Sequence, residues 1–195
     1  MRITVVQSFK ALALLLAAGL LPAAAQQAPP AAAPPGPQFT MSSPAYPDGG
    51  EIPVKYSCSA KPAAVTPALE WMNVPKGAAS LTLIFHDPDA HPAKGMWDVT
   101  HWIVWNIPAT STGLPEDVPA GPKMADGATQ GKNIRGVNGY QGPCPPPGKP
   151  HHYTYELYVL DTMLDLGPDA SRADVMKAMD GHIIGKAVYA GLFRR

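Results

Sequence analysis

The sequence is poor in cysteine and in charge, and these shortages exclude several classes of protein. Its 195 residues include only two cysteines, Cys58 and Cys144, so neither a dense disulfide scaffold nor a four-thiolate zinc site is available. Charged residues make up 15% of the chain, and the 15 basic residues balance the 15 acidic ones. Such a composition does not fit a coiled coil, and no broad electrostatic field favours nucleic acid or an anionic membrane as the partner.

The apolar run near the N-terminus is too short to span a membrane. Residues 11–21 are 11 apolar or small residues, whereas a bilayer core of about 30 Å needs about 20. Arg2 and Lys10 supply positive charge before the run, and three alanines at 23–25 offer a cleavage site. We therefore predict a secretory signal peptide at residues 1–25, cleaved before Gln26, and a periplasmic or secreted protein without a membrane span. An uncleaved anchor is the alternative.

Proline and glycine are abundant, at 24 and 18 residues. They argue against a helical bundle and for short strands joined by rigid turns. Residues 26–38 contain five prolines and no charge, which predicts an extended tether that cannot bury a core. The folded domain is then expected to span residues 39–195.

Three runs of strand-forming residues stand between turn signals, at residues 81–85, 101–107 and 153–160. The last alternates, which places Tyr153, Tyr155, Leu157 and Val159 on one face of a strand. Between the second and third runs lies a long segment rich in Gly, Pro, Asn and Asp, of the kind that is usually functional or partly structured.

One helix is predicted near the end of the chain. Ser171 can cap it with Asp174 three residues on, and Val175, Met179 and Ile183 follow at helical spacing. Residue 185, a glycine, is expected to end it, and residues 187–193 then form a last short strand. The sequence thus predicts a mainly β domain of mostly antiparallel sheets packed face to face.

Polar residues cluster at the boundaries of the predicted strands. Asp87 follows the first strand, His101 opens the second, and His151 stands at the start of the third. An Asp-Pro pair is often a plain turn and a single histidine is often structural, so each cluster alone is weak evidence. Three of them at strand ends of one small domain suggest a site.

Four ordered segments resemble the phosphatidylethanolamine-binding protein family, and most closely its bacterial YbhB/YbcL-type Raf-kinase-inhibitor-like branch. They are DPDA at 87–90, HWIVWNIP at 101–108, GPCPPPG at 142–148 and HHYTYELYVLD at 151–161. The resemblance spans residues 39–195. It implies a large antiparallel sheet packed on a smaller sheet, with a C-terminal helix and peripheral turns.

The resemblance also implies a small surface pocket for an anionic group such as phosphate or a phosphoethanolamine headgroup. Matched residue by residue, its ligand-binding positions are Asp87, His101, His151, Tyr153, Cys144 and Pro145. Asp89 matches a second signature acid, for which a structural role is expected. The sequence departs from the family at the pocket rim: His91 precedes Pro92, and His152 stands where animal members have arginine.

The residue types fit such a pocket. Imidazoles, a tyrosine hydroxyl and backbone N–H groups can donate to a dianion. Asp87 is expected to favour the protonated form of both histidines and to orient their rings. Because no arginine fork is expected, we predict modest, pH-sensitive binding.

Three functions remain open. The first is a non-enzymatic binding or inhibitor-like protein without a cofactor, since the resemblance implies protein targets such as kinases or proteases. The second is a metal-dependent or acid–base hydrolase using His101, His151, Asp87 and His86, although no HExxH, nucleophile-elbow or P-loop motif is present. The third is an envelope protein that acts through homodimerisation or interaction.

The two cysteines are predicted to form a disulfide. Export exposes Cys58 and Cys144 to oxidation, and an even pair in an exported domain is more often bridged than free. Two isolated buried thiols are the alternative. Because Cys144 lies near the expected pocket, the bond would fix the backbone wall of that pocket.

Overall fold

The computed structural model describes residues 37–92, 94 and 96–195. The predicted signal peptide and residues 26–36 of the predicted tether lie outside the described residues. The fold is that of the compact unit Pro35–Arg195. Within the described residues, no helix combines the length and apolar character that a membrane crossing requires.

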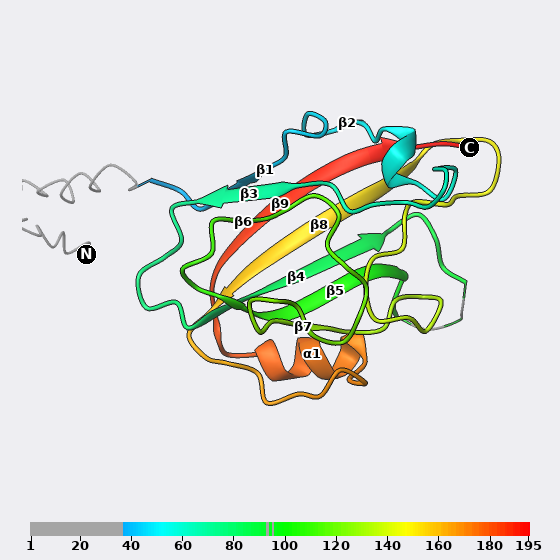
Figure 1. The fold of residues 1–195 in the computed structure, drawn as a ribbon. Helices are drawn as coiled ribbons and strands as arrows, with labels where there is room; N and C mark the ends of the chain where they lie inside the picture. Colours follow the sequence, from blue (N-terminus) through cyan, green and yellow to red (C-terminus); the bar gives the residue numbers. More distant parts are fainter. Residues whose placement is uncertain (1–36, 93, 95) are drawn as a thin grey trace, which may run out of the picture. The chain divides into compact units, whose positions relative to one another are not determined.

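Two sheets form the domain, as Figure 1 shows. The larger sheet has six strands, in the order β2 (Gly50–Glu51), β9 (Ile183–Phe193), β8 (His151–Leu160), β4 (Ser80–Asp87), β5 (Val99–Pro108) and β7 (Thr129–Gln130). The smaller sheet consists of β1 (Thr40–Ser42), β3 (Leu69–Met72) and β6 (Gly113–Leu114). Neighbouring strands are antiparallel except for β2 and β9, which are parallel. The predicted mainly β fold with a large and a small sheet is confirmed.

The main core lies between the two sheets. The predicted face of β8, which carries Tyr153, Tyr155, Leu157 and Val159, is fully buried in this core. The smaller sheet contributes apolar side chains to the same cluster, among them Trp71. Because successive side chains of a strand point to opposite sides, Tyr158 and Leu160 of β8 belong instead to a second buried cluster on the other face of the sheet.

The other face of the larger sheet packs against α1 (Arg172–Met179). Val175 and Met179 of the helix are fully buried with Ile84, Ile103 and Trp105 of the sheet. At the start of the helix, the Ser171 hydroxyl and the Asp174 carboxylate form the predicted capping box with each other's backbone N–H groups.

The predicted end of this helix is wrong. Asp180 already has extended backbone angles, and Gly181 has a positive φ of 80°, so the chain leaves the helix after Met179. Ile183 therefore begins β9, where 45% of its surface is exposed. The last strand is correspondingly longer than predicted, and Gly185 lies inside it.

The long segment between β5 and β8 is partly structured, as predicted. It contains β6 and β7, and side-chain amides fix its turns. The Gln130 amide nitrogen donates to the carbonyl oxygens of Pro119 and Gly121, both at 2.9 Å. The Asn133 amide nitrogen donates to the Gly139 carbonyl at 2.9 Å. These bonds satisfy backbone groups that a plain loop would leave to water.

Candidate functional site

The sheet topology brings the three predicted strand-end residues together. Asp87 is the last residue of β4, His151 is the first residue of β8, and His101 lies near the start of β5. Because β4 runs antiparallel to both β5 and β8, its end lies beside the beginnings of its two neighbours.

A cleft of about 380 Å³ opens at this edge of the sheet. Its walls come from β4, β5, β8 and the loops that join them. Its lining residues are Asp87, Ala90, Val99, His101, Ile134, Arg135, Gln141, Cys144, Pro145, Pro146 and His151. Five of the six predicted ligand-binding residues thus line the cleft, and Tyr153 is the one that does not.

A β-bulge directs His101 into the cleft. Phe85 of β4 pairs with Trp102, but His86 pairs with Thr100, so His101 is an extra residue without a partner on β4. In a regular strand, His101 and Trp102 would face opposite sides of the sheet. The bulge lets His101 and Trp102 both point to the face of the sheet that carries Phe85. The ring centroids of His101 and Phe85 are 5.6 Å apart.

Asp87 orients the ring of His151 through a hydrogen bond. One carboxylate oxygen of Asp87 lies 2.8 Å from Nδ1 of His151, and the other accepts the backbone N–H of Asp89 at 3.0 Å. The Asp87 side chain is 4% exposed and that of His151 is 19% exposed. The carboxylate is therefore screened from the solvent, and the imidazole presents its Nε2 atom to the cleft.

His101 is held by a backbone carbonyl. Its Nδ1 atom donates to the carbonyl oxygen of Gln141 at 2.8 Å. Burial lowers the pKa of His101, although the Gln141 carbonyl and the nearby Asp87 carboxylate act in the opposite direction. Asp87 thus favours the protonated form of His101, as expected, but desolvation outweighs the attraction of the carboxylate.

Tyr153 supports the two histidines from the core. Its side chain is fully buried, and its ring centroid lies 5.2 Å from that of His101 and 6.5 Å from that of His151. Burial and then the Asp87 charge raise the pKa of Tyr153 well above its usual value. Its hydroxyl has no hydrogen-bond partner in the described part of the chain. Tyr153 therefore lies in the core behind the residues that line the cleft.

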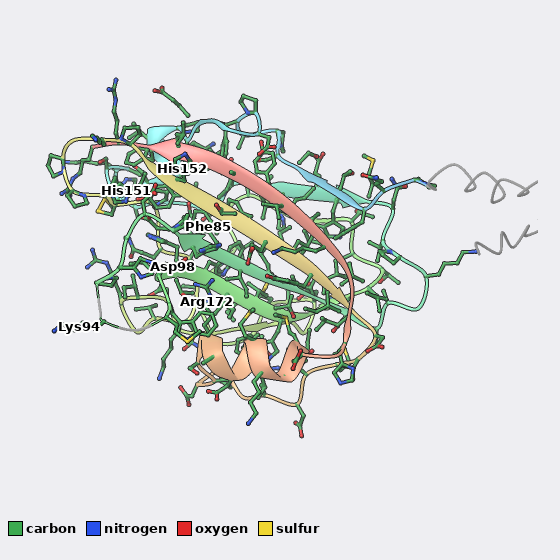
Figure 2. All side chains as sticks on the ribbon, turned by 180° about the vertical axis from the view of Figure 1, so that it is seen from behind. Phe85, Lys94, Asp98, His151, His152 and Arg172 are labelled. Carbon is green, nitrogen blue, oxygen red and sulfur yellow. A yellow bond between two sulfur atoms is a disulfide. The ribbon has the colours of Figure 1, made fainter. Side chains whose placement is uncertain are left out.

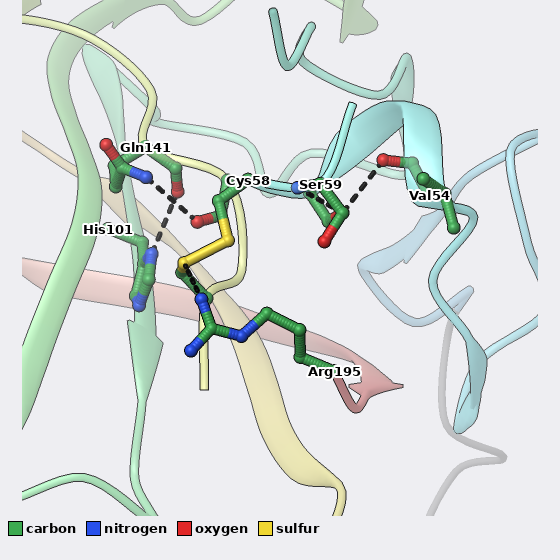
Figure 3. The surroundings of a disulfide bond; sticks show 9 residues. Val54, Cys58, Ser59, His101, Gln141 and Arg195 are labelled. Atoms are coloured by element: carbon green, nitrogen blue, oxygen red, sulfur yellow. Dashed lines mark hydrogen bonds between the residues drawn. A yellow bond between two sulfur atoms is a disulfide. The ribbon is translucent and has the colours of Figure 1, made fainter. Parts of the chain in front are cut away.

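The predicted disulfide between Cys58 and Cys144 is present and closes one wall of the cleft (Figure 3). The Cys58 N–H donates to the Pro143 carbonyl at 3.0 Å, and the Tyr140 hydroxyl donates to the Tyr56 carbonyl at 2.8 Å. Residues 140–144 are thereby fastened to residues 56–58 by a covalent bond and two hydrogen bonds.

Arg135 corrects the expectation of a site without arginine. It lies in an exposed turn after β7 and lines the cleft beside Ile134. The turn is held on β5 because the Ile134 N–H donates to the Thr100 carbonyl at 2.9 Å. Among the described residues, Arg135 has no carboxylate within salt-bridge distance. Sequence analysis missed it because its only signal was its place between Asn133 and Gly136 in a turn-rich segment.

Asp89 has the structural contacts expected of it. Its carboxylate accepts the backbone N–H of His152 at 2.7 Å and lies 2.8 Å from the Nδ1 atom of the same residue. These bonds lower the pKa of Asp89. They fasten the start of β8, and therefore His151, to the turn after β4.

His86 lies on the opposite face of the sheet from the cleft. Its Nδ1 atom is 2.7 Å from Asp98, which also pairs with Arg172 of α1. Figure 2 shows the labels of Asp98 and Arg172 close together near the helix, with His151 and His152 farther from it. His86 therefore does not join the other three residues of the hydrolase hypothesis. In the ranges that the structure describes, no three His, Cys, Asp or Glu side chains are grouped so that they could hold a metal ion.

Comparisons with known proteins agree with this architecture. A family model described as phosphatidylethanolamine-binding protein matches residues 42–194. A UPF0098 protein of Methanothermobacter thermautotrophicus is 49% identical over 155 residues, which are 80% of this chain and 98% of that protein.

Two solved structures have similar folds. A phosphatidylethanolamine-binding protein homologue from Chlamydia trachomatis is 34% identical with a TM-score of 0.72, over 81% of this chain and 98% of that one. Escherichia coli YbcL, described as a member of the mammalian phosphatidylethanolamine-binding protein family, is 31% identical with a TM-score of 0.71. The match covers 82% of this chain and 99% of that one.

Proposed function

Since the chain belongs to the phosphatidylethanolamine-binding protein family, we propose that it is an exported binding protein whose cleft takes a small anion. The ligand class is phosphate or a phosphoethanolamine-like headgroup. Export rests on the signal-like residues 1–25.

The observation that carries the proposal is the charge arrangement around the cleft. The Arg135 guanidinium has no carboxylate partner among the described residues, and the Asp87 carboxylate is already engaged by His151 and by the Asp89 N–H. Asp87 therefore repels an incoming anion less than a free carboxylate would. A protonated His151 would donate through Nε2 while Asp87 holds its other nitrogen.

Binding should strengthen in mild acid. Protonation of an imidazole in the cleft would add positive charge, so we expect tighter binding at about pH 6 than at about pH 8. Inorganic phosphate and phosphoethanolamine are the ligands for a calorimetric titration at these two pH values.

Two variants and a control assign the effect to the cleft. We expect Arg135→Gln and His151→Ala each to weaken binding by about tenfold, the loss of one hydrogen bond to a charged group. Lys177→Gln, which removes an exposed charge on α1, should leave the affinity unchanged. Circular dichroism checks that each variant is folded. No binding by the unsubstituted protein, or equal affinities in all variants, would refute the proposed function.

A further inference from the structure

The Gln141 carbonyl fixes which nitrogen of His101 carries a hydrogen. A carbonyl oxygen only accepts hydrogen bonds, so the Nδ1 atom that lies 2.8 Å from it must be the donor. The Gln141 N–H donates in turn to the His101 carbonyl at 2.8 Å. This second bond fixes the Gln141 backbone relative to the backbone of His101, so its carbonyl oxygen stays within reach of Nδ1 and favours the tautomer that carries the hydrogen there.

The Gln141 carbonyl itself cannot move away easily. It lies in the segment 140–144, which the Cys58–Cys144 disulfide and the Tyr140 hydroxyl fasten to residues 56–58. Figure 3 shows Gln141 between His101 and Cys58. The orientation of the His101 ring is therefore a built feature of the cleft wall.

The nitrogen that remains for the cleft is Nε2, and in the neutral ring it carries only a lone pair. His101 is 4% exposed, and the rings of Phe85 and Tyr153 pack against it. Burial lowers its pKa, which favours the neutral ring at pH values where other imidazoles begin to charge. A ligand oxygen that carries no hydrogen cannot donate to Nε2, and its own lone pair would repel that of the nitrogen.

We infer that His101 is a hydrogen-bond acceptor in this cleft, so that the cleft selects anions that bring a hydrogen atom of their own. This inference rests on the proposed function, because it specifies the ligand of the same site. A phosphate monoester, whose second pKa is about 6, has largely lost its P–OH hydrogen near neutral pH, whereas inorganic phosphate retains at least one. Sulfate has the same shape and no such hydrogen. A site that leaves a polar group unpaired rejects the ligand that lacks its partner.

A lipid headgroup could supply the hydrogen from a different atom. A phosphate diester has no P–OH hydrogen, but the ethanolamine ammonium group has N–H hydrogens, and the choline group has none. Two matched pairs therefore separate the sources: phosphate against sulfate, and glycerophosphoethanolamine against glycerophosphocholine.

The test is a calorimetric titration of the disulfide-bonded protein with these four compounds at about pH 7, slightly above the reference pKa of a histidine side chain. In at least one pair, we expect the hydrogen-bearing member to bind about tenfold more tightly or better. The pair that shows the preference identifies free phosphate or the headgroup as the source. Because sulfate is at least as negative as phosphate, simple charge attraction predicts the opposite order.

Two variants connect the preference with His101. The amide of His101→Gln can rotate its NH₂ group toward the ligand, so we expect the preference to shrink to about threefold or less while binding persists. His182→Gln is the matched control, because His182 is exposed and pairs with Asp161, which follows the end of β8 opposite to His151. It should retain the full preference.

The outcomes distinguish the two proposals. If both members of each pair bind equally, the acceptor role of His101 is wrong and the anion site stands. The same conclusion follows if His101→Gln, folded by circular dichroism, keeps the full preference. If none of the four compounds binds, the proposed function itself fails.

Discussion

At the scale of single residues, the burial of His101 connects the site with the stability of the domain. Burial lowers the pKa of His101 in the folded protein, whereas the unfolded chain titrates it near the reference value of about 6.5. Between these two values the unfolded state binds more protons than the folded state. The free energy of unfolding therefore falls as the pH decreases through this window.

We predict that His101→Gln reduces this acid sensitivity. Urea denaturation at about pH 7 and at about pH 5.5 should show a loss of stability in the unsubstituted protein, at most about 1.4 kcal/mol for each pH unit that lies between the folded and unfolded pKa values of His101. The variant should lose less between the same two pH values, whatever its stability at pH 7. Asp89 and Glu116, whose pKa values are lowered, lose their contribution only in stronger acid. Equal losses in His101→Gln and in His182→Gln would contradict the prediction.

At the scale of elements, a glycine allows the cleft wall to approach residues 56–58. A Cβ atom on Gly142 would lie 2.7 Å from the Tyr56 carbonyl oxygen and 2.9 Å from the carbonyl carbon of Ser57. Both are backbone atoms beside the disulfide, so they cannot yield as a flexible side chain would. The wall itself would have to move.

We expect Gly142→Ala to destabilise the domain by about 1–3 kcal/mol, the usual cost of overpacking. It should also weaken phosphate binding, because the Gln141 carbonyl moves with the wall. Gly167→Ala is the control, since a Cβ atom there would meet no heavy atom within 4 Å. Thermal denaturation and phosphate titration of both variants measure the two effects. If the two variants are equally stable, the close approach at Gly142 does not matter.

The strands that position the site could be predicted from local patterns. Alternation placed Tyr153 and Tyr155 on one face of β8, which the structure buries, and the turn signals located Asp87 and His151 at strand ends. The end of α1 was missed because Gly181 and Gly185 both offer a helix stop, and the choice depends on where β9 pairs with β8.

The rest of the site depends on contacts between distant segments. The bulge at His101 arises from the pairing register of β4 and β5, which no short pattern of residues reveals. The lowered pKa of His101 arises from its burial beside Phe85 and Tyr153. Arg135 reaches the cleft because its turn is fastened to Thr100, and an exposed arginine in a turn has no periodicity that would indicate this.

At the scale of the whole molecule, the disulfide joins parts of the chain that are 86 residues apart. In the chain-entropy model, closing a loop of this length removes roughly 4–5 kcal/mol of conformational freedom from the unfolded state. The same bond fixes the segment that holds the Gln141 carbonyl. The stability of the domain and the orientation of His101 in the cleft thus depend on one oxidation step, which an oxidising compartment favours.

Export and oxidation should therefore be visible together in the mass of the protein. We predict that protein recovered from cells that produce it begins at Gln26 and is lighter by two hydrogen atoms than its reduced form. Intact mass spectrometry under non-reducing, denaturing conditions with an alkylating agent present measures both properties. The mature chain should take up no alkyl group before reduction and two afterwards, one at each of Cys58 and Cys144.

Protein expressed without residues 1–25 in a reducing cytosol is the control, and it should be alkylated at both thiols. A chain that keeps residues 1–25 would refute signal cleavage, and a cleaved chain alkylated before reduction would refute the disulfide as its exported state.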